Sequence, residues 1–196
     1  MAAVEEHIQE LAVLGISRPS TLPVFYRVSH DQLTQDTHIQ VVGEETSGEV
    51  EACVFAVEGE LLVGVASDHT DRKLEAHSVA LSKQICAKPI GDVVWRFSDV
   101  KAHWDELILR SWVEENGVQV LYQEGVLSSL RTPQDLIAGF TGGQQALPDG
   151  TAMACGTVPA KGGIRPAASF SMELHDPRLN RSLRHSYSIQ TLPEVA

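Results

Sequence analysis

The sequence predicts a strand-rich mixed α/β fold with few short helices. Apolar residues alternate with polar ones over many short runs, which is the period of a β-strand. Two pairs of these runs are separated by tight-turn sequences, Glu58-Gly59-Glu60 and Glu115-Asn116-Gly117, and are therefore expected to form β-hairpins. Helical spacing occurs in few segments, and the sequence has no internal repeat or low-complexity tract. The 196 residues are therefore expected to form a single domain.

The first elements along the chain are a predicted helix and two short strands. Residues 4–14 carry apolar side chains at helical spacing, and Gly15 follows as a natural end of the helix. Prolines then favour an extended connection. Residues 25–28 and 38–42 are expected to form strands on either side of a polar turn.

The two expected hairpins occupy the middle of the chain. Residues 49–57 pair with 61–66 in the first hairpin, and residues 107–114 pair with 118–125 in the second. The elements expected between the hairpins are a helix at 73–86 and a strand at 93–97.

The last third of the chain begins with a helix and ends with strands. Thr132 is a candidate N-cap and Pro133 occupies the first helical position, so a helix is expected at 132–140. The elements expected after it are a turn, a short strand and a Gly/Pro loop within 147–163, followed by strands at 169–176 and 180–192.

The charge and composition exclude several classes of partner. The formal net charge is −11, from 15 Lys+Arg and 26 Asp+Glu, so the overall field repels nucleic-acid phosphates and anionic membrane surfaces. No apolar run approaches the ~18 residues that span a bilayer, and the acidic N-terminus lacks the pattern of a secretory signal. The three cysteines are too far apart for a CxxC motif and suit reduced core thiols. A cytoplasmic protein that binds neither nucleic acid nor membrane is expected.

Two carboxylates, Glu49 and Glu51, are the first candidates for a chemical site. Side chains two residues apart on a strand project from the same face, so these two would repel each other if they were partly buried. A divalent cation removes that repulsion and accepts oxygen ligands. Asp68 ends the partner strand of the same predicted hairpin and can complete a three-carboxylate site. The alternative is a solvated strand face.

The polar cluster after this hairpin, residues 67–72, has two interpretations. Its Asp and Ser residues favour a hydrophilic turn. Its Arg72 follows a buried strand and lies near several carboxylates, which also suits recognition of a substrate carboxylate. The sequence alone leaves both interpretations open.

His7 and Glu10 are three residues apart on the predicted N-terminal helix and share one face. A carboxylate can orient an imidazole and stabilise its protonated form, which makes a general base near neutral pH. Exposed pairs of this kind also occur on helices without any catalytic role.

A glycine-containing loop, Gly156-Thr157-Val158-Pro159 followed by Lys161-Gly162-Gly163, can bring backbone N–H groups close to an anion. The sequence contains no GxxxxGK[ST], GxGxxG, GxSxG or HExxH motif. Nucleotide binding, serine-hydrolase chemistry and zinc-protease chemistry therefore have no support.

The order of these pieces resembles the fumarylacetoacetate-hydrolase-like superfamily. That superfamily has, in order, a His-x-x-Glu pair, a P-x-x-x-F stretch, an E-x-E strand, an N-D-x-S-x-R strand end, a lysine followed by a proline, and a Gly-Thr-Pro-type loop. The matching pieces here are His7-Ile8-Gln9-Glu10, Pro19 to Phe25, Glu49-Val50-Glu51, residues 67–72, Lys83 with Pro89, and Gly156-Thr157-Val158-Pro159. The stretches SGEVEACVF, SDHTDRKLEAHSVALSKQ and VLYQEG look more narrowly like the domain-of-unknown-function 2848 (DUF2848) family. The resemblance covers essentially the whole chain.

The resemblance implies a mixed β-roll that forms a homodimer. It implies an N-terminal helix or lid at residues 1–20 and a β-roll core at residues 21–196. It implies that Glu49, Glu51 and Asp68 are metal ligands, usually for Mg²⁺ or Mn²⁺, and that Lys83 binds and polarises the substrate. It implies that Arg72, Gly156 and Thr157 contact substrate oxygens. It also implies that His7 and Glu10 activate water.

Several positions depart from the family pattern. Ser67 stands where the family has Asn. Lys83 lies one residue closer to Pro89 than the pattern requires, which leaves Lys88 as a competing candidate. The chain begins only six residues before His7, where relatives have a strand, so a shortened lid is expected.

The leading hypothesis for function is a metal-dependent hydrolase that cleaves a C–C bond next to a ketone in a small oxo acid or β-dicarbonyl compound. The metal acts as a Lewis acid, His7 oriented by Glu10 deprotonates water, and Lys83 helps to stabilise the developing oxyanion or enolate. One alternative is a 2-oxo acid hydratase, decarboxylase or isomerase that uses the same enolate. A further alternative is a ligand-binding relative without turnover.

Overall fold

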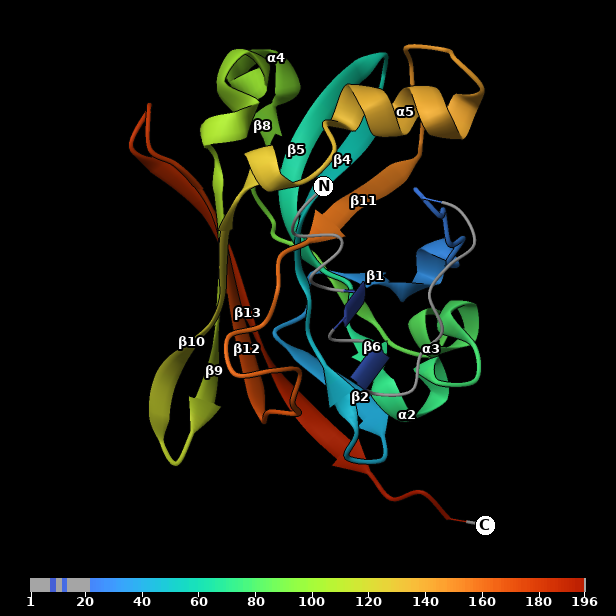
Figure 1. The fold of residues 1–196 in the computed structure, drawn as a ribbon, viewed down its shortest axis with the longest axis vertical. Coiled ribbons are helices and arrows are strands. Elements are labelled where there is room, and N and C mark those ends of the chain that lie inside the picture. The colour runs from blue at the N-terminus through green and yellow to red at the C-terminus, as the bar shows by residue number, and fades with distance from the viewer. Residues whose placement is uncertain (1–7, 10–11, 14–21, 196) are drawn as a thin grey trace.

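The computed structural model describes residues 8–9, 12–13 and 22–195, in which two β-sheets pack against each other with a few short helices around them (Figure 1). The first sheet has five strands in the order β10-β9-β12-β13-β2. The second sheet has four strands in the order β11-β4-β5-β8, and β1-β7 and β3-β6 form two further pairs. The predicted strand-rich mixed α/β fold is confirmed.

The long strands belong to the two large sheets, and the helices are short. The five-stranded sheet contains β2 (His38–Val42), β9 (Ile108–Glu115), β10 (Val118–Val126), β12 (Ser169–Asp176) and β13 (Arg181–Leu192). The four-stranded sheet contains β4 (Val50–Val57), β5 (Glu60–Ser67), β8 (Trp95–Arg96) and β11 (Ala152–Thr157). The small pairs contain β1 (Leu33–Thr34), β7 (Lys88–Pro89), β3 (Thr46–Ser47) and β6 (Thr70–Asp71). The helices are α2 (Arg72–Glu75), α3 (Val79–Gln84), α4 (Phe97–Val100), α5 (Pro133–Thr141) and the 3₁₀ turns η1 (His30–Gln32), η2 (Lys101–Glu106) and η3 (Leu127–Ser129).

Both predicted hairpins are confirmed. β4 and β5 are antiparallel, and their turn residues Glu58 and Gly59 have φ of 51° and 77°. β9 and β10 are joined in the same way, since Asn116 and Gly117 have φ of 52° and 77°. Positive φ at both turn residues matches the right-handed twist of the flanking strands, and Asn and Gly adopt it at low cost.

The single helix expected at 73–86 is wrong, because the segment forms two helices. α2 ends at Glu75 and α3 begins at Val79. The hydroxyl of Ser78 accepts a hydrogen bond from the N–H of Leu81 and so caps the start of α3. The side-chain cap at Ser78 therefore starts a second helix within a segment whose apolar spacing predicted one continuous helix.

The predicted helix at 132–140 is confirmed as α5. The hydroxyl of Thr132 accepts from the N–H of Asp135, and Pro133 occupies the first turn. Gly142 ends the helix with φ of 71°, a left-handed conformation that suits glycine.

Two expected strands are wrong in whole or in part. Residues 25–28 form no strand, and Phe25 packs edge-on against Phe140 of α5 with ring centroids 5.6 Å apart. Of residues 93–97, only those of β8 pair with β5, and α4 begins directly after them. The apolar side chains of 25–28 therefore contact α5 and line the cavity beside it, and they do not belong to the strand that the sequence predicted.

Of the predicted helix 4–14, residues 8–9 and 12–13 are described and have helical backbone. The rest of this helix lies outside the described residues, as does most of the expected lid at 1–20. The division of the chain into a lid and a β-roll core therefore stays a prediction. Among the described helices, none is long and apolar enough to cross a bilayer.

The core lies between the two large sheets. Its fully buried members include Val50, Ala52 and Val54 of β4 and Leu109, Phe170, Met172 and Leu174 of the five-stranded sheet. Full burial of one large apolar side chain is worth about 1.5–3 kcal/mol. Because side chains alternate along a strand, the residues between the β4 core positions face the opposite side of the four-stranded sheet. The candidate site is built on that opposite side.

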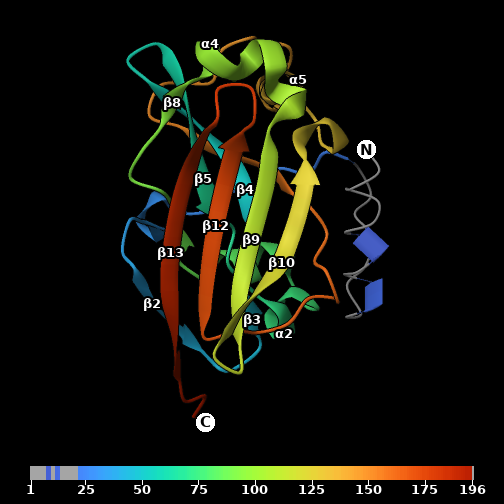
Figure 2. The same cartoon turned by 90° about the vertical axis from the view of Figure 1, so that its left-hand side faces the viewer.

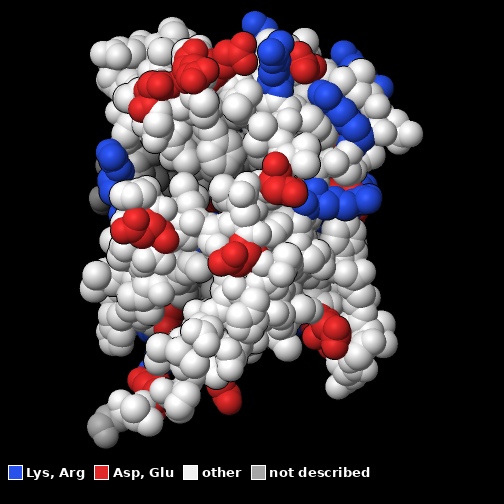
Figure 3. Space-filling model, turned by 180° about the vertical axis from the view of Figure 1, so that it is seen from behind, with Lys and Arg blue, Asp and Glu red and all other residues white. Residues whose placement is uncertain are grey.

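Charged side chains of both signs lie on the face of the molecule opposite to that in Figure 1. Figure 3 shows Lys and Arg interspersed with Asp and Glu on one face of the molecule, without a continuous basic stripe on that face. A basic stripe is the usual electrostatic footprint of nucleic-acid binding. The view agrees with the acidic net charge of −11.

Candidate metal centre

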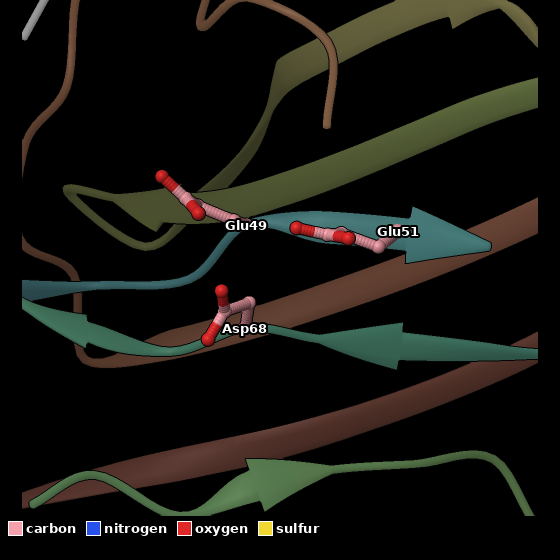
Figure 4. A group of neighbouring side chains, drawn as sticks. All are labelled: Glu49, Glu51 and Asp68. Carbon is pink, nitrogen blue, oxygen red and sulfur yellow. The ribbon is translucent and has the colours of Figure 1, made fainter. Parts of the chain in front are cut away.

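Three carboxylates meet at one end of the β4–β5 hairpin (Figure 4). Glu49 immediately precedes β4 and Glu51 is its second residue, so the period of two puts both side chains on the face turned away from the core. Asp68 directly follows β5, and its N–H donates to the Glu49 carbonyl over 2.9 Å. One oxygen from each carboxylate lies within 4.8 Å of the others. Glu49 and Glu51 are 4% and 5% exposed, so the three acidic groups share a small, largely buried volume.

This crowding changes the ionisation of Glu51. Burial, then Asp68 and Glu49, raise the pKa of Glu51 to about 8, although Lys83 and the N–H of Gly156 act in the opposite direction. The Gly156 N–H donates to Glu51 Oε2 over 2.6 Å. At neutral pH, Glu51 therefore holds a proton unless a bound cation compensates for its charge.

The donor set fits a hard divalent cation. Asp68 Oδ1 is buried and accepts no hydrogen bond from the described part of the chain, although Lys88 Nζ lies 3.4 Å away. A carboxylate oxygen without a hydrogen bond, beside two further carboxylates, matches the oxygen ligands that Mg²⁺ and Mn²⁺ prefer. The ligand roles of Glu49, Glu51 and Asp68 stay a prediction, and the geometry is compatible with them.

Two lysines approach the carboxylates and differ in what they contact. Lys83 on α3 places Nζ 2.5 Å from Asp68 Oδ2 and 3.5 Å from Glu49 Oε2. Lys88 on β7 donates to three backbone carbonyls at 2.6, 2.5 and 3.0 Å. An ammonium has three donor hydrogens, so these carbonyls use all of them. Lys88 therefore mainly holds the backbone around the site and lies 3.4 Å from Asp68 Oδ1, whereas Lys83 is directed at the carboxylates.

The two lysines also differ in their ionisation. Burial alone would lower the pKa of Lys83, but Asp68 and Glu49 raise it above its ordinary value. Lys83 is therefore an ammonium at neutral pH, which can neutralise negative charge but cannot accept a proton. For Lys88, burial is the largest effect, and its pKa is lowered.

Arg72 is buried between two acidic side chains. Its Nη2 lies 2.8 Å from Glu49 Oε1 and its Nη1 lies 2.8 Å from Glu75 Oε2, while Nε donates to Ser47 Oγ over 2.7 Å. Burial would lower the pKa of Arg72, but Glu49 and Glu75 raise it above its ordinary value. The guanidinium therefore positions Glu49. The expected contact of Arg72 with a substrate stays a prediction, and Glu75 is a buried partner that sequence reasoning missed.

Gly156 lies in a β-bulge, where the pairing of β11 with β4 shifts between Ala154 and Thr157. Its φ of 97° is a conformation that residues with a side chain rarely adopt. The bulge directs the Gly156 N–H to Glu51, so the contact seen for this predicted substrate-binding residue is with a carboxylate of the site.

Gln123 is a second residue that sequence reasoning missed. It is 2% exposed, and its Nε2 donates to Thr157 Oγ1 over 2.8 Å and to the Val158 carbonyl over 2.6 Å. Its Oε1 accepts from the Val50 N–H and from Ser111 Oγ. Thr157 in turn donates to the Val50 carbonyl over 2.8 Å. Gln123 thus ties β10 to β4 and β11, and the available signal was a glutamine within the apolar run VLYQEG.

A hydrogen-bonded network under the end of the hairpin was also missed. The ring nitrogens of His69 lie 3.0 Å from Tyr187 Oη and 2.9 Å from Thr46 Oγ1, and Tyr187 Oη lies 2.8 Å from Ser67 Oγ. Burial, followed by two neighbouring cations, lowers the pKa of His69 to about 3. His69 is therefore neutral at physiological pH and anchors the chain on both sides of Asp68.

A cavity of about 850 Å³ opens beside the three carboxylates. Its charged end is lined by these carboxylates, both lysines and the Gly156–Thr157 bulge. Its apolar end is lined by Phe25, Phe55, Leu136, Phe140 and Met153. The size and the mixture of apolar walls with a few charged groups are typical of a small-molecule site.

The predicted pair His7 and Glu10 lies outside the described residues. Ile8, between them in sequence, is described and lines the cavity. The role of the pair in activating water stays a prediction.

Two solved structures share the fold of this chain at low sequence identity. Cg1458 with an inhibitor has a TM-score of 0.63 and 18% identity, over 82% of this chain and 64% of that protein. The 2-keto-3-deoxy-D-arabinonate dehydratase complexed with magnesium and 2,5-dioxopentanoate has a TM-score of 0.62 and 16% identity, over 87% of this chain and 63% of that protein. The chain thus spans less than two thirds of the length of these two proteins. The fold is the fumarylacetoacetate-hydrolase-like fold expected from the sequence.

A family model described as a protein of unknown function, DUF2848, matches residues 1–187. The chain belongs to the DUF2848 family, as the narrower resemblance indicated. A search of curated protein sequences finds no match to the chain.

Proposed function

We propose that the protein is an enzyme that binds Mg²⁺ or Mn²⁺ through Glu49, Glu51 and Asp68 and acts on a small 2-oxo acid or β-dicarbonyl compound. The observation that carries this proposal is the group of three carboxylates within 4.8 Å, at the charged end of the cavity, in which Asp68 Oδ1 accepts no hydrogen bond from the described residues. A structure of similar fold, the dehydratase, is complexed with magnesium and with 2,5-dioxopentanoate, which is an oxo acid.

The charge of the centre suits an anionic ligand. When ionised, the three carboxylates and Glu75 carry one more negative charge than the two lysines and Arg72 carry positive charges. A divalent cation would reverse this to a single positive excess. Buried charges require compensation, and the carboxylate of an oxo acid would supply it.

The residues of the site have distinct parts in the proposed chemistry. A bound divalent cation supplies Lewis acidity toward a carbonyl oxygen. Lys83 holds a fixed ammonium beside Asp68, where it stabilises negative charge that develops on a ligand oxygen. Because the raised pKa of Lys83 excludes it as a base, the proton acceptor comes from elsewhere. We assign that part to His7 oriented by Glu10, since their neighbour Ile8 lines the cavity.

Two classes of reaction are compatible with this arrangement. The first is hydrolysis of a C–C bond next to a ketone, with His7 and Glu10 activating the water. The second is dehydration, decarboxylation or isomerisation of a 2-oxo acid, and the likeness to a dehydratase favours it. Turnover in ¹⁸O-labelled water separates them by mass spectrometry, because hydrolysis places one solvent oxygen in the new carboxylate. His7→Ala tests the dyad, since unchanged turnover would contradict its assigned part.

The metal site is tested by thermal unfolding with added MgCl₂ or MnCl₂. At about a hundredfold excess over Kd, binding stabilises the folded state by about 2.7 kcal/mol, which raises Tm by about 5–10 °C in a chain of this size. We expect this rise for the wild type and for Glu44→Gln, which removes an exposed carboxylate outside the site. We expect no rise for Glu49→Gln or Glu51→Gln.

Equal shifts in all four proteins would place the metal elsewhere, and no shift in any would remove the basis of the enzyme proposal. Saturable binding of oxo acids without product would identify a ligand-binding relative. A homodimer and a cytoplasmic location remain expectations from the sequence.

A further inference from the structure

The cavity beside the metal centre is larger than a small oxo acid requires. Its volume is about 850 Å³, and cavities of this size enclose ligands as large as drug molecules. The three carboxylates Glu49, Glu51 and Asp68 lie at one end of it. The rest of the cavity therefore has room for a second part of the ligand, and its walls indicate the chemistry of that part.

One face of β4 forms a wall of the cavity from the charged end onward. Figure 2 shows β4 and β5 behind the five-stranded sheet. Glu51, Cys53 and Phe55 alternate with the core residues of β4, so they face away from that sheet and line the cavity. Burial raises the pKa of the Cys53 thiol well above its ordinary value, so the thiol is uncharged. Beyond Glu51, this face of β4 therefore carries a neutral thiol and an aromatic ring.

The neighbouring strand β11 leaves space open along this wall. Ala152 pairs with Phe55 and Ala154 pairs with Cys53, so the two alanines lie on the same face of the sheet as their partners. Ala154 is exposed within the cavity that it lines. The ring of Phe55 lies toward β5, on the other side of β4, since a Cβ added to Gly64 would be 2.9 Å from its Cε2. The small side chains of β11 thus leave room for a ligand alongside β4.

Further walls of the apolar end come from α5 and from residues 22–30. Leu136 and Phe140 are four residues apart on α5, so they share one face of the helix, and both line the cavity. Phe25 packs edge-on against Phe140, with ring centroids 5.6 Å apart. A ligand that extends beyond the carboxylates therefore meets aliphatic and aromatic surfaces.

We propose that the ligand of this site carries an uncharged apolar tail, such as an alkyl or arylalkyl chain, which extends from its oxo-acid head along β4 and β11 toward Phe55 and Phe140. This inference rests on the proposed function, which places the oxo-acid head at the metal centre. An apolar tail gains affinity by leaving water for these walls, whereas a charged tail would lose its hydration there.

The spacing along β4 sets the length of this tail. Phe55 follows Glu51 by four residues, which is about 14 Å along an extended strand. An extended polypeptide has three chain atoms in each residue, so this distance corresponds to roughly a dozen chain atoms. A ligand of roughly eight to twelve chain atoms, head included, therefore reaches from the carboxylates to the aromatic end.

A second anionic group at the far end of the ligand is the alternative, because Arg27, His30 and Arg131 also line the cavity. Arg27 and His30 are exposed, and the guanidinium of Arg27 lies 5.3 Å from the centre of the Phe140 ring. Ion pairs with such solvated groups contribute little, so the walls favour the apolar tail. Two ligands of equal length separate the possibilities, since 2-oxooctanoate ends in a methyl group and 2-oxooctanedioate ends in a carboxylate.

Isothermal titration calorimetry at saturating MgCl₂ tests the proposal with 2-oxobutanoate, 2-oxohexanoate, 2-oxooctanoate and 2-oxodecanoate. Each CH₂ group that is buried should tighten binding about fourfold. We therefore expect 2-oxooctanoate to bind on the order of a hundredfold more tightly than 2-oxobutanoate. We expect 2-oxooctanedioate to bind at least about tenfold more weakly than 2-oxooctanoate, because its second carboxylate loses hydration.

Leucine substitutions on β11 test where the tail lies. Ala154→Leu and Ala152→Leu each fill the space beside β4, so we expect the preference for 2-oxooctanoate over 2-oxobutanoate to fall by about tenfold or more. Ala168→Leu makes the same change at an exposed position outside the cavity, and this matched control should keep the full preference. The thermal shift with MgCl₂ establishes that each variant is folded and binds the metal.

The outcomes separate the tail from the proposed function. Affinities that do not change with chain length, or tighter binding of 2-oxooctanedioate than of 2-oxooctanoate, would overturn the tail and leave the proposed function intact. Folded, metal-binding leucine variants that keep the full preference would also overturn it, because the tail would then lie elsewhere. A protein that shows the MgCl₂ shift but binds no oxo acid of any length would overturn the proposed function, and the tail with it.

Discussion

Four charged side chains cross the outer face of the five-stranded sheet in the strand order Glu124, Arg110, Glu173 and Arg184, and we call them the charge row. The charge row and the metal centre use the same kinds of side chain in opposite ways. In the charge row, each charge has only opposite charges as row neighbours, and its buried member Glu173 is paired with two arginines, Arg110 and Arg184. At the metal centre, three carboxylates lie within 4.8 Å of one another and are largely buried. In the charge row, each charge is balanced by its neighbours. At the metal centre, the clustered and buried carboxylates raise the pKa of Glu51 and favour binding of a cation. The comparison shows that the arrangement of charges, more than composition, separates a structural charge pattern from a chemical site.

The largest expected effect is the loss of the buried guanidinium at the centre. Arg72→Met removes the partner of Glu75 and one partner of Glu49 in a buried setting, which typically costs about 3–5 kcal/mol of unfolding free energy. Urea unfolding measures this loss. Arg110→Met removes a guanidinium from the charge row and is the matched control, with an expected loss of about 1 kcal/mol, because Glu124 is exposed and the buried Glu173 keeps Arg184 as a partner. Equal losses would show that burial does not distinguish the two regions.

The next largest effect is expected at Lys88. Lys88→Met removes the donor to the carbonyls of His69, Lys83 and Cys86, which leaves buried acceptors unsatisfied. We expect a loss of about 2–3 kcal/mol in urea unfolding. Lys88→Arg should recover little of it, since a planar guanidinium cannot reproduce the geometry of an ammonium. Unchanged stability in Lys88→Met would mean that these three hydrogen bonds do not hold the site together.

The pH dependence of metal binding is expected to reveal the crowding at Glu51. Its folded pKa of about 8 lies above its ordinary value of 4.5, so this group stabilises the metal-free fold below pH 4.5 and loses that contribution as pH rises through 8. A metal requires the ionised carboxylate, so the apparent Kd should rise about tenfold for each pH unit below 8, or about 1.4 kcal/mol per unit.

Thermal shifts with MgCl₂ at pH 6, 7 and 8 measure this dependence. We expect the shift to increase toward pH 8 in the wild type and in Glu44→Gln. A shift of constant size from pH 6 to pH 8 would contradict the crowded-carboxylate account.

The smallest effect is expected at the end of the charge row. The side chain of Arg184 is 72% exposed, so Arg184→Ala should change the unfolding free energy of the monomer by about 1 kcal/mol or less. Urea unfolding measures this effect. A loss of several kcal/mol there would show that the charge row is part of the monomer's core stability.

Local sequence signals were enough to predict much of the fold. The hairpins follow from turn residues with positive φ, such as Asn116 and Gly117, and α5 follows from Thr132 and Pro133. The juxtaposition of Glu49 and Glu51 with Asp68 follows from the first hairpin, because pairing of adjacent strands is a local consequence of the turn.

The remaining features depend on contacts between segments far apart in sequence. Gln123 is more than 70 residues from Val50, and Tyr187 is more than 100 residues from His69, so no local pattern reveals either contact. The break in the helix 73–86 depends on Ser78 acting as a cap, which competes with the apolar spacing. Local sequence patterns therefore do not reveal the polar residues, such as Gln123 and Tyr187, that hold the site together.

The two faces of β4 carry different kinds of side chain, and this limits how the protein can change in evolution. One side of β4 carries Glu51 into the cavity, and the other carries Val50 and Val54 into the core. Deleting or inserting one residue ahead of the strand would exchange the two sides, burying carboxylates among apolar side chains and sending valines to the cavity. Insertions and deletions are therefore expected to be absent within this strand in any descendant that stays folded. Length variation would be accepted at the exposed Glu58–Gly59 turn instead, where a Cβ added to Gly59 would meet no atom within 4 Å.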